Sequence, residues 1–283
     1  MRRSGFTGSA RSLALGAWVL LAGTPRTAAA EPVRINGSGS GLDLMKPLLE
    51  AYAASHREER VRLDAPLGTA GSMQAVLEGA LDVAVVSRLP SPEEVARGAR
   101  AHEYGRTPLL IVTHEAVDKK DVTTAELEEI YSRKRTTWPG GQTIRVILRP
   151  VKEANTKILS SVSPGMERAD AMLRKLPWAL VAVTDPESND MVARTPGAIG
   201  AATLTSTIVG QLPLNRLSLD GIEGTTEALA RGKYPLSKHV VFVTTARTPP
   251  AALAIIAFAC SAQGRSVAAK AGLLVTGCGD PVR

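Results

Sequence analysis

GTAGSMQAVLEGALDVAVVSR, residues 68–88, decides the fold class, because it combines a small-residue loop, an apolar helix and the buried strand 82–86. The N-terminus of a helix carries unpaired N–H groups and a partial positive charge, so the loop suits an anion. Ser87 and Arg88 end the strand, at the edge where α/β sheets usually bind their ligands. The alternative is an ordinary βαβ segment whose loop is small only for packing.

Strand-like and helix-like segments alternate along the chain, which favours an α/β fold with largely parallel strands. Two matching apolar strands, 108–113 and 235–244, bracket a middle block. This predicts two lobes: residues 31–110 and 236–283 form lobe 1, and residues 111–235 form lobe 2. Helices are expected over residues 42–55, from a capping box at Thr123 to about 131, 249–260 and 263–271. The other expected strands are 33–36, 61–65, 144–148, 178–183 and 198–202, with polar loops before and between the last two.

The N-terminus has the pattern of an export signal. Arg2, Arg3 and Arg11 come before the apolar run 13–22, and small residues follow this run up to Ala30. This predicts a signal over residues 1–30, cleavage at Ala30-Glu31 and a periplasmic protein. The run is shorter than the ~20 residues of a spanning helix.

Charge and composition narrow the class of ligand. The signal contains four arginines and no acidic residue, so its removal lowers the net charge from +7 to about +3. Mild basicity suits a small anion and does not indicate nucleic-acid binding. Aromatic residues make up only 4% of the chain, which leaves little for base stacking.

Cys260 and Cys278 are the two cysteines of the chain. In an oxidising compartment a pair is more often a disulfide than two free thiols, so we expect them to be bonded. The four histidines are scattered and match no metal-binding spacing. We therefore expect no metal and no cofactor.

A second Gly/Ser loop, residues 37–41, also lies between a strand and a helix. It does not match G-x-G-x-x-G, because residue 42 is leucine, nor the nucleophile elbow G-x-S-x-G, because residue 39 is glycine. Its candidate donors are Ser40 and the N–H groups of Gly41 and Leu42. The alternative is a plain flexible connection.

Arg149 ends the apolar strand 144–148, and an arginine at such a place is costly unless its charge is matched. Asn155 and Thr156 follow and could cap the next helix. The alternative here is an ordinary cap beside a solvated arginine.

Together with the export signal, these loops resemble the phosphate-binding proteins of ABC importers, in the type II periplasmic binding family. The similarity extends over nearly the whole mature chain and includes TAELEEIYSRKRTTWPGG, residues 124–141, and TPGAIG, residues 195–200. The resemblance implies an α/β fold of two lobes, each a mixed sheet flanked by helices. It also implies a monomer without enzyme activity that carries phosphate or a similar oxyanion to an ABC permease.

By position, the resemblance implies that one oxyanion is bound by Ser40, Gly41, Leu42, Thr69, Ala70, Ser87, Arg149, Asn155 and Thr156, and Arg88 joins this set from its place beside Ser87. Two features depart from the family pattern. Glu153-Ala154-Asn155-Thr156 replaces a Ser-Gly-Thr that often follows the arginine, and Ser87 replaces an aspartate that accepts the proton of hydrogen phosphate. Loss of that acceptor weakens discrimination against sulfate; Asp43 and Glu153 are the first candidates to replace it.

Two other functions compete with transport. A sensor or partner-binding domain of the same fold would bind another anion. A secreted phosphate-ester hydrolase would need a nucleophile–base or metal motif, and the sequence offers neither.

Overall fold

A computed structural model describes Met1, Gly5 and residues 31–278. The predicted export signal therefore lies, apart from those two residues, outside the described part of the chain. All the elements named below belong to the compact unit that begins at Glu31.

The first part of the sheet is built by both ends of this unit. β1 (Val33–Gly37) lies between β2 (Val61–Leu63) and β3 (Val83–Val86), and the three are parallel. β10 (Ser237–Thr244) pairs antiparallel with β3. The helices and the short strand of this region are α1 (Gly39–Ala53), α2 (Gly68–Glu78), α3 (Pro92–Ala96), α10 (Pro250–Cys260), α11 (Ala262–Lys270) and β11 (Leu274–Val275).

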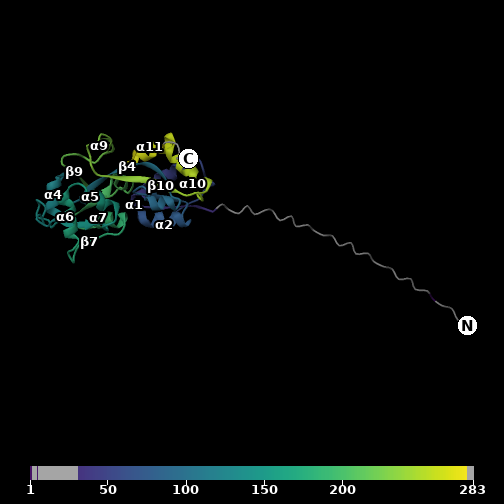
Figure 1. The fold of residues 1–283 in the computed structure, drawn as a ribbon, viewed down its shortest axis with the longest axis horizontal. Coiled ribbons are helices and arrows are strands. Elements are labelled where there is room, and N and C mark those ends of the chain that lie inside the picture. Colours follow the sequence, from purple (N-terminus) through teal and green to yellow (C-terminus); the bar gives the residue numbers. More distant parts are fainter. Residues whose placement is uncertain (2–4, 6–30, 279–283) are drawn as a thin grey trace. The chain divides into compact units, whose positions relative to one another are not determined.

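β4 (Arg100–His114) joins the two halves of the molecule. Its first half pairs with β10, and its second half pairs with β8 (Ala198–Thr203) and β9 (Leu214–Leu219). The sheet order is β2-β1-β3-β10-β4-β8-β6-β7, so one strand continues from one lobe into the other. Figure 1 shows β4 and β10 between the purple, blue and yellow elements and the teal and green ones.

The middle of the chain completes the second part of the sheet. β6 (Arg145–Leu148) is parallel to β8 and to the edge strand β7 (Leu180–Val181), and β5 (Asp121–Val122) is parallel to β9. The helices of this region are α4 (Thr124–Tyr131), α5 (Ala154–Ser160), α6 (Pro164–Leu173), α7 (Asp185–Arg194), α8 (Leu204–Val209) and α9 (Thr226–Ala230).

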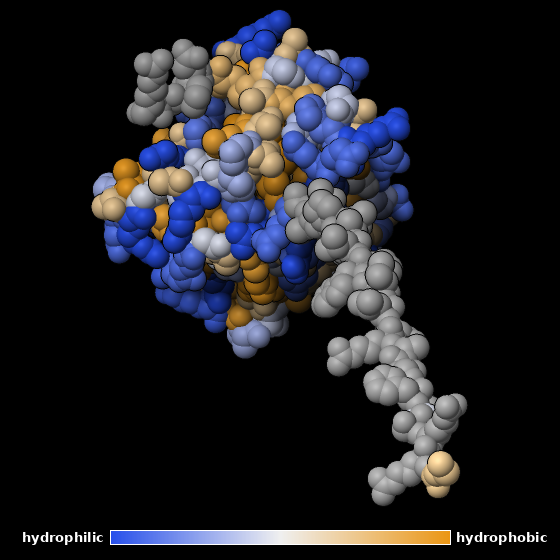
Figure 2. Space-filling view, turned by 90° about the vertical axis from the view of Figure 1, so that its right-hand side faces the viewer, coloured by the Kyte–Doolittle hydropathy of each residue, from blue (hydrophilic) through white to orange (hydrophobic). Residues whose placement is uncertain are grey.

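The buried apolar side chains form separate cores that follow this division. One core takes its residues from Leu109 to Leu236. Two others take theirs from Val33–Tyr104 and Val240–Leu273. The fold is therefore two-lobed. On the face shown in Figure 2, hydrophilic residues surround the apolar residues that reach the surface.

The structure agrees with two local expectations, a helix cap and a disulfide. The capping box at Thr123 is confirmed, since its hydroxyl and the Glu126 carboxylate exchange hydrogen bonds with each other's backbone N–H. Cys260 and Cys278 are joined in a disulfide, with their Cα atoms 5.3 Å apart. Within residues 31–278 no single helix is long and apolar enough to cross a membrane; only the pair α10 and α11, bent by 68°, meets that criterion together.

Three expectations were wrong. The segment before residue 178 is not a polar loop throughout but contains α6. GTAGS is not a loop before a helix but the first five residues of α2, and Gly68 begins it with a left-handed φ of +73°. The segment between 183 and 198 is not a polar loop but contains α7. Its sequence, DPESNDMVAR, has few apolar residues, yet Thr184 and Glu187 form a complete capping box that starts the helix.

Candidate functional site

One buried carboxylate accepts hydrogen bonds from four donors in four different segments of the chain. Asp185 is the first residue of α7 and only 6% exposed. Its Oδ2 accepts from the Ser40 N–H at 3.1 Å and from Lys238 Nζ at 3.0 Å. Its Oδ1 accepts from Arg149 Nη2 and Asn155 Nδ2, each at 3.2 Å. We call these five residues the Asp185 cluster.

Ser40 contributes its backbone rather than its hydroxyl. It is the second residue of α1, where the N–H groups have no partner within the helix. The close approach depends on its neighbour: a Cβ added at Gly39 would lie 2.7 Å from Asp185 Cβ and 2.8 Å from Pro186 Cδ. A glycine at this position therefore lets the starts of α1 and α7 touch.

Arg149 follows β6 directly and is 5% exposed. Its Nη1 donates to the Ala182 carbonyl at 2.8 Å, so the guanidinium is fixed on two sides. Its own carbonyl accepts from the Thr156 hydroxyl at 3.0 Å and from Arg174 Nη1 at 2.6 Å. Thr156 therefore supports Arg149 and gives its proton to the backbone in this structure, and its role as an anion donor stays a prediction.

Lys238 is a member of the cluster that sequence reasoning missed. It is fully buried in β10, and Asp185 is its ion-pair partner. Lys238 lies two and four residues before Val240 and Phe242, which belong to the first-lobe core. The signal was the period-two pattern of this strand, which turns residue 238 inward with these two side chains.

The electrostatics of the cluster keep Asp185 charged. Burial alone would raise the pKa of its carboxyl, but Lys238, Arg149 and the Ser40 N–H outweigh burial and lower that pKa to about 2. Glu153 lies 3.6 Å from Arg149 Nη2 and is largely buried. The Asp185 cluster and Glu153 together thus place two cations and two carboxylates largely out of contact with water.

The carboxylate does not use all the buried polar atoms in this region. Arg149 Nε, Asn155 Oδ1 and Glu153 Oε2 make no hydrogen bond within the described protein. Beside Arg149, Asn155 and Thr156 there is a cavity of only about 10 Å³, about enough for one water. The cluster therefore leaves one donor and two acceptors unused, and the cavity has no room for a further anion.

Gly41 and Leu42 do not offer the N–H groups that the sequence predicts. The Gly41 N–H donates to the Ser38 hydroxyl at 3.2 Å, which caps α1. The Leu42 N–H donates to the Ser38 carbonyl at 2.9 Å as the first ordinary helical bond. Both donors are used inside the helix, so Ser40 alone among these three reaches the cluster.

Thr69 and Ser87 meet each other and do not contact Asp185. The Ser87 N–H donates to Thr69 Oγ1 at 3.2 Å, and the buried Ser87 hydroxyl makes no hydrogen bond within residues 31–278. Ala70, beside Thr69 in α2, is exposed. Thr69 and Ser87 thus form a second polar group at the end of β3.

Arg88 lies outside both groups. Its guanidinium binds the Glu94 carboxylate through two hydrogen bonds of 2.6 and 2.7 Å, and its side chain is 43% exposed. Glu94 belongs to the capping box of α3, which follows in the chain. Arg88 therefore bonds to Glu94 and to no residue of the Asp185 cluster, and its role as a ligand donor stays a prediction.

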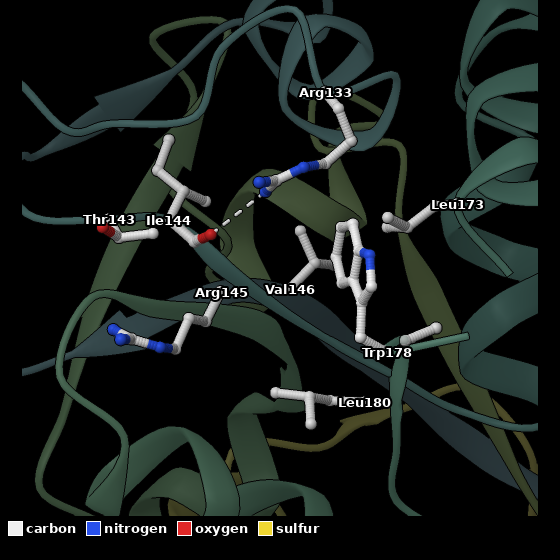
Figure 3. Close-up of a pocket in the computed structure, with 9 residues that line it drawn as sticks. Arg133, Thr143, Ile144, Arg145, Val146, Leu173, Trp178 and Leu180 are labelled. Atoms are coloured by element: carbon white, nitrogen blue, oxygen red, sulfur yellow. Dashed lines mark hydrogen bonds between the residues drawn. The ribbon is translucent and has the colours of Figure 1, made fainter. Parts of the chain in front are cut away.

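A larger pocket lies at the other end of β6 (Figure 3). It measures about 280 Å³, its wall is mostly apolar, and the Arg133 guanidinium lies 5.0 Å from the centre of the Trp178 ring. Arg145, which lines this pocket, precedes Arg149 by four residues, so the pocket and the Asp185 cluster are separated by roughly 13 Å along the strand.

Across the described residues, no three His, Cys, Asp or Glu side chains are grouped as a metal site.

Comparison with known proteins gives a consistent result. The chain is 30% identical over 102 residues to the phosphate-binding protein PstS 2 of Streptococcus pneumoniae, a match that spans only 34% of that protein. It is 20% identical over 256 residues to the phosphate-binding protein PstS of Borreliella burgdorferi, covering 86% of this chain and 89% of that one.

Solved structures show the same fold. A Clostridium perfringens structure with bound phosphate, described as a candidate phosphate ABC transporter substrate-binding protein, has a TM-score of 0.73 at 20% identity, covering 87% of this chain and all of that one. The family described as the PBP superfamily domain matches residues 22–263. With this match over most of its length, the chain belongs to the PBP superfamily.

Proposed function

We propose that this protein binds phosphate, or a similar tetrahedral oxyanion, between its lobes at the place of the Asp185 carboxylate. The observation that carries the proposal is the convergence of a helix N–H, an amide, a guanidinium and an ammonium on one anion. Buried cations are rare unless they are matched by an opposite charge. A group with this composition is suited to a dehydrated anion.

The unused polar atoms favour a ligand larger than a carboxylate. A tetrahedral oxyanion has four oxygens. These can accept hydrogen bonds from Arg149 Nε as well as from the donors that now bond to Asp185. Asn155 Oδ1 and Glu153 Oε2 are free acceptors and suit the proton of hydrogen phosphate. Asp43, the other candidate acceptor, already binds Lys46 at 2.8 Å.

We further propose that the protein is exported to the periplasm, acts as a monomer and passes its ligand to an ABC permease. The export pattern over residues 1–30 and the phosphate-binding relatives support this assignment. Binding without catalysis agrees with the family, which consists of binding domains.

The test is calorimetry of the mature chain, residues 31–283, with phosphate, arsenate and sulfate. We expect one site for phosphate, and at least tenfold weaker binding in Arg149→Met and in Lys238→Met, since a bond to a charged ligand contributes roughly 1.5–3 kcal/mol. Lys46→Met is the matched control, because Lys46 is 61% exposed and bonds to Asp43, not to a residue of the cluster.

Two results would overturn the proposal. If no oxyanion of the panel binds while another class of anion does, the protein is a sensor of that anion. If the protein instead hydrolyses p-nitrophenyl phosphate, and Arg149→Met does not, the site is that of a hydrolase.

A further inference from the structure

We infer that Asp185 is an internal competitor for the oxyanion: its carboxylate occupies the ligand's donors, closes the two lobes on each other when no ligand is present, and must be displaced before an oxyanion binds. This inference rests on the proposed function. It adds an affinity-determining residue that the resemblance to phosphate-binding proteins does not contain.

The first argument is occupancy. Each of the four donor groups of the cluster already bonds to Asp185, at 3.0 to 3.2 Å, and only Arg149 Nε is left unused. The adjoining cavity of about 10 Å³ has no room for an oxyanion. Because Asp185 is charged at neutral pH, an oxyanion beside it would also meet a like charge at close range. The two anions therefore exclude each other.

The second argument is the way in which the carboxylate divides its bonds between the lobes. Oδ1 binds Arg149 and Asn155, which lie beside the second-lobe core to which α7 also belongs. Oδ2 binds Ser40 on α1 of the first lobe and Lys238 on β10, whose Val240 lies in the first-lobe core. One side chain thus connects both lobes, as a bound ligand would.

The third argument is that Asp185 can leave. It is the first residue of α7, after the N-cap Thr184, so its side chain is not enclosed by further turns of its own helix. Gly39 places no side chain between it and α1. If the lobes part by a few ångströms, Oδ2 loses Ser40 and Lys238. The carboxylate then becomes solvated and can turn away from Arg149 and Asn155, which leaves all four donors to an oxyanion.

The consequence is a reduced apparent affinity. When only a fraction of the protein is in the binding-competent state, the measured dissociation constant equals the intrinsic one divided by that fraction. The wild-type protein is closed with and without ligand, whereas a variant without this carboxylate is open until an oxyanion closes it. Removing the carboxylate should therefore raise affinity rather than lower it.

The experiment compares wild type, Asp185→Ala, the isosteric Asp185→Asn and the control Asp190→Asn. Asp190 lies on the same helix and is 54% exposed, so its variant removes the same charge without touching the cluster. Phosphate affinity is measured by calorimetry, and the radius of gyration by small-angle X-ray scattering with and without phosphate.

We expect Asp185→Ala to bind phosphate at least tenfold more tightly than wild type, and Asp185→Asn to be intermediate. Ligand-free Asp185→Ala should have a larger radius of gyration than wild type and become more compact with phosphate. Asp190→Asn should match wild type in both measurements. If Asp185→Ala does not fold, Asp185→Asn, which keeps the side-chain volume, carries the test alone.

The outcomes separate this inference from the proposed function. If wild type binds phosphate and the Asp185 variants bind equally or more weakly, the inference is wrong and the proposed function stands. A selective loss of phosphate over sulfate in Asp185→Asn also overturns it, since Asp185 would then accept the ligand's proton. Binding by the variants but not by wild type supports the competitor and overturns oxyanion capture by wild type. If none of them binds, both proposals are wrong.

Discussion

Arg149 and Arg88 stand in equivalent places of the two lobes, yet their environments differ. Each directly or closely follows a buried strand, β6 or β3, and precedes a helix that begins a few residues later. Arg149 is 5% exposed and shares a carboxylate with a buried lysine. Arg88 is 43% exposed and binds the glutamate of its own capping box.

The difference shows what makes a charged strand end a candidate site. Arg88 finds its partner six residues away, so its charge is matched locally and partly by water. Arg149 is removed from water, and the carboxylate that it hydrogen-bonds is Asp185, 36 residues away on α7. Glu153, four residues away, lies 3.6 Å from the same guanidinium. A buried charge needs a partner or a ligand, whereas a half-exposed one needs neither.

Replacing Arg149 should have the largest effect on stability. Arg149→Met leaves Asp185 and Glu153 buried with Lys238 as the one remaining cation of the cluster. Breaking a buried ion pair in this way costs about 3–5 kcal/mol. The free energy of unfolding, measured by urea denaturation at pH 7, should fall by that amount. A loss below about 1 kcal/mol would show that Arg149 is no better buried than Arg88.

Acid should weaken the cluster in a defined pH window. The pKa of Asp185 is lowered from 3.8 to about 2 in the folded protein. Its stabilisation is therefore present above about pH 4 and is lost as the pH falls towards 2, an effect on the order of 2 kcal/mol. The difference in unfolding free energy between wild type and Asp185→Asn, measured by denaturation across this range, should shrink as the pH falls. A constant difference would mean that Asp185 does not titrate with the fold.

The contact between the two helix starts can be tested at Gly39. An added methyl group would lie 2.7 Å from Asp185 Cβ and 2.8 Å from Pro186 Cδ, so Gly39→Ala should push α7 away from α1 and lengthen the Ser40–Asp185 bond. Overpacking costs about 1–3 kcal/mol, and we expect the lower end, because the first turn of α7 can shift. Thermal denaturation gives the loss of stability. Gly140→Ala, where an added Cβ meets no atom within 4 Å, is the control.

Much of the fold follows from local sequence patterns. The strands 82–86 and 144–148 agree with β3 and β6 to within one residue, because their buried apolar runs are bounded by polar residues. Ser40, Arg149 and Asn155, three of the predicted ligand residues, all bond to Asp185. Each lies at the end of a strand or the start of a helix. These places are set by short segments of sequence.

The rest of the site depends on topology, which local patterns do not encode. Ser40 and Asp185 are 145 residues apart, and their contact requires both lobes to be assembled. Asp185 was missed because α7 has few apolar residues, although its capping box was a readable signal. Lys238 was missed because a lysine in a strand is ordinarily exposed, and only its phase relative to Val240 shows that it points inward.

The smallest effect is expected at Arg88. The Arg88 guanidinium holds the pKa of Glu94 at about 2, yet the arginine side chain is half-exposed, and solvent screens the pair. Glu94 also keeps its bond to the Ser91 N–H at 2.7 Å when Arg88 is removed. Arg88→Met should therefore lower the free energy of unfolding by about 0–1 kcal/mol. Calorimetry should give the same phosphate affinity as wild type, because Arg88 bonds to Glu94 and to no residue of the Asp185 cluster. A tenfold loss of affinity in Arg88→Met, with stability unchanged, would instead mean that the end of β3 contributes to the ligand site, and that Arg88 leaves Glu94 when the oxyanion binds.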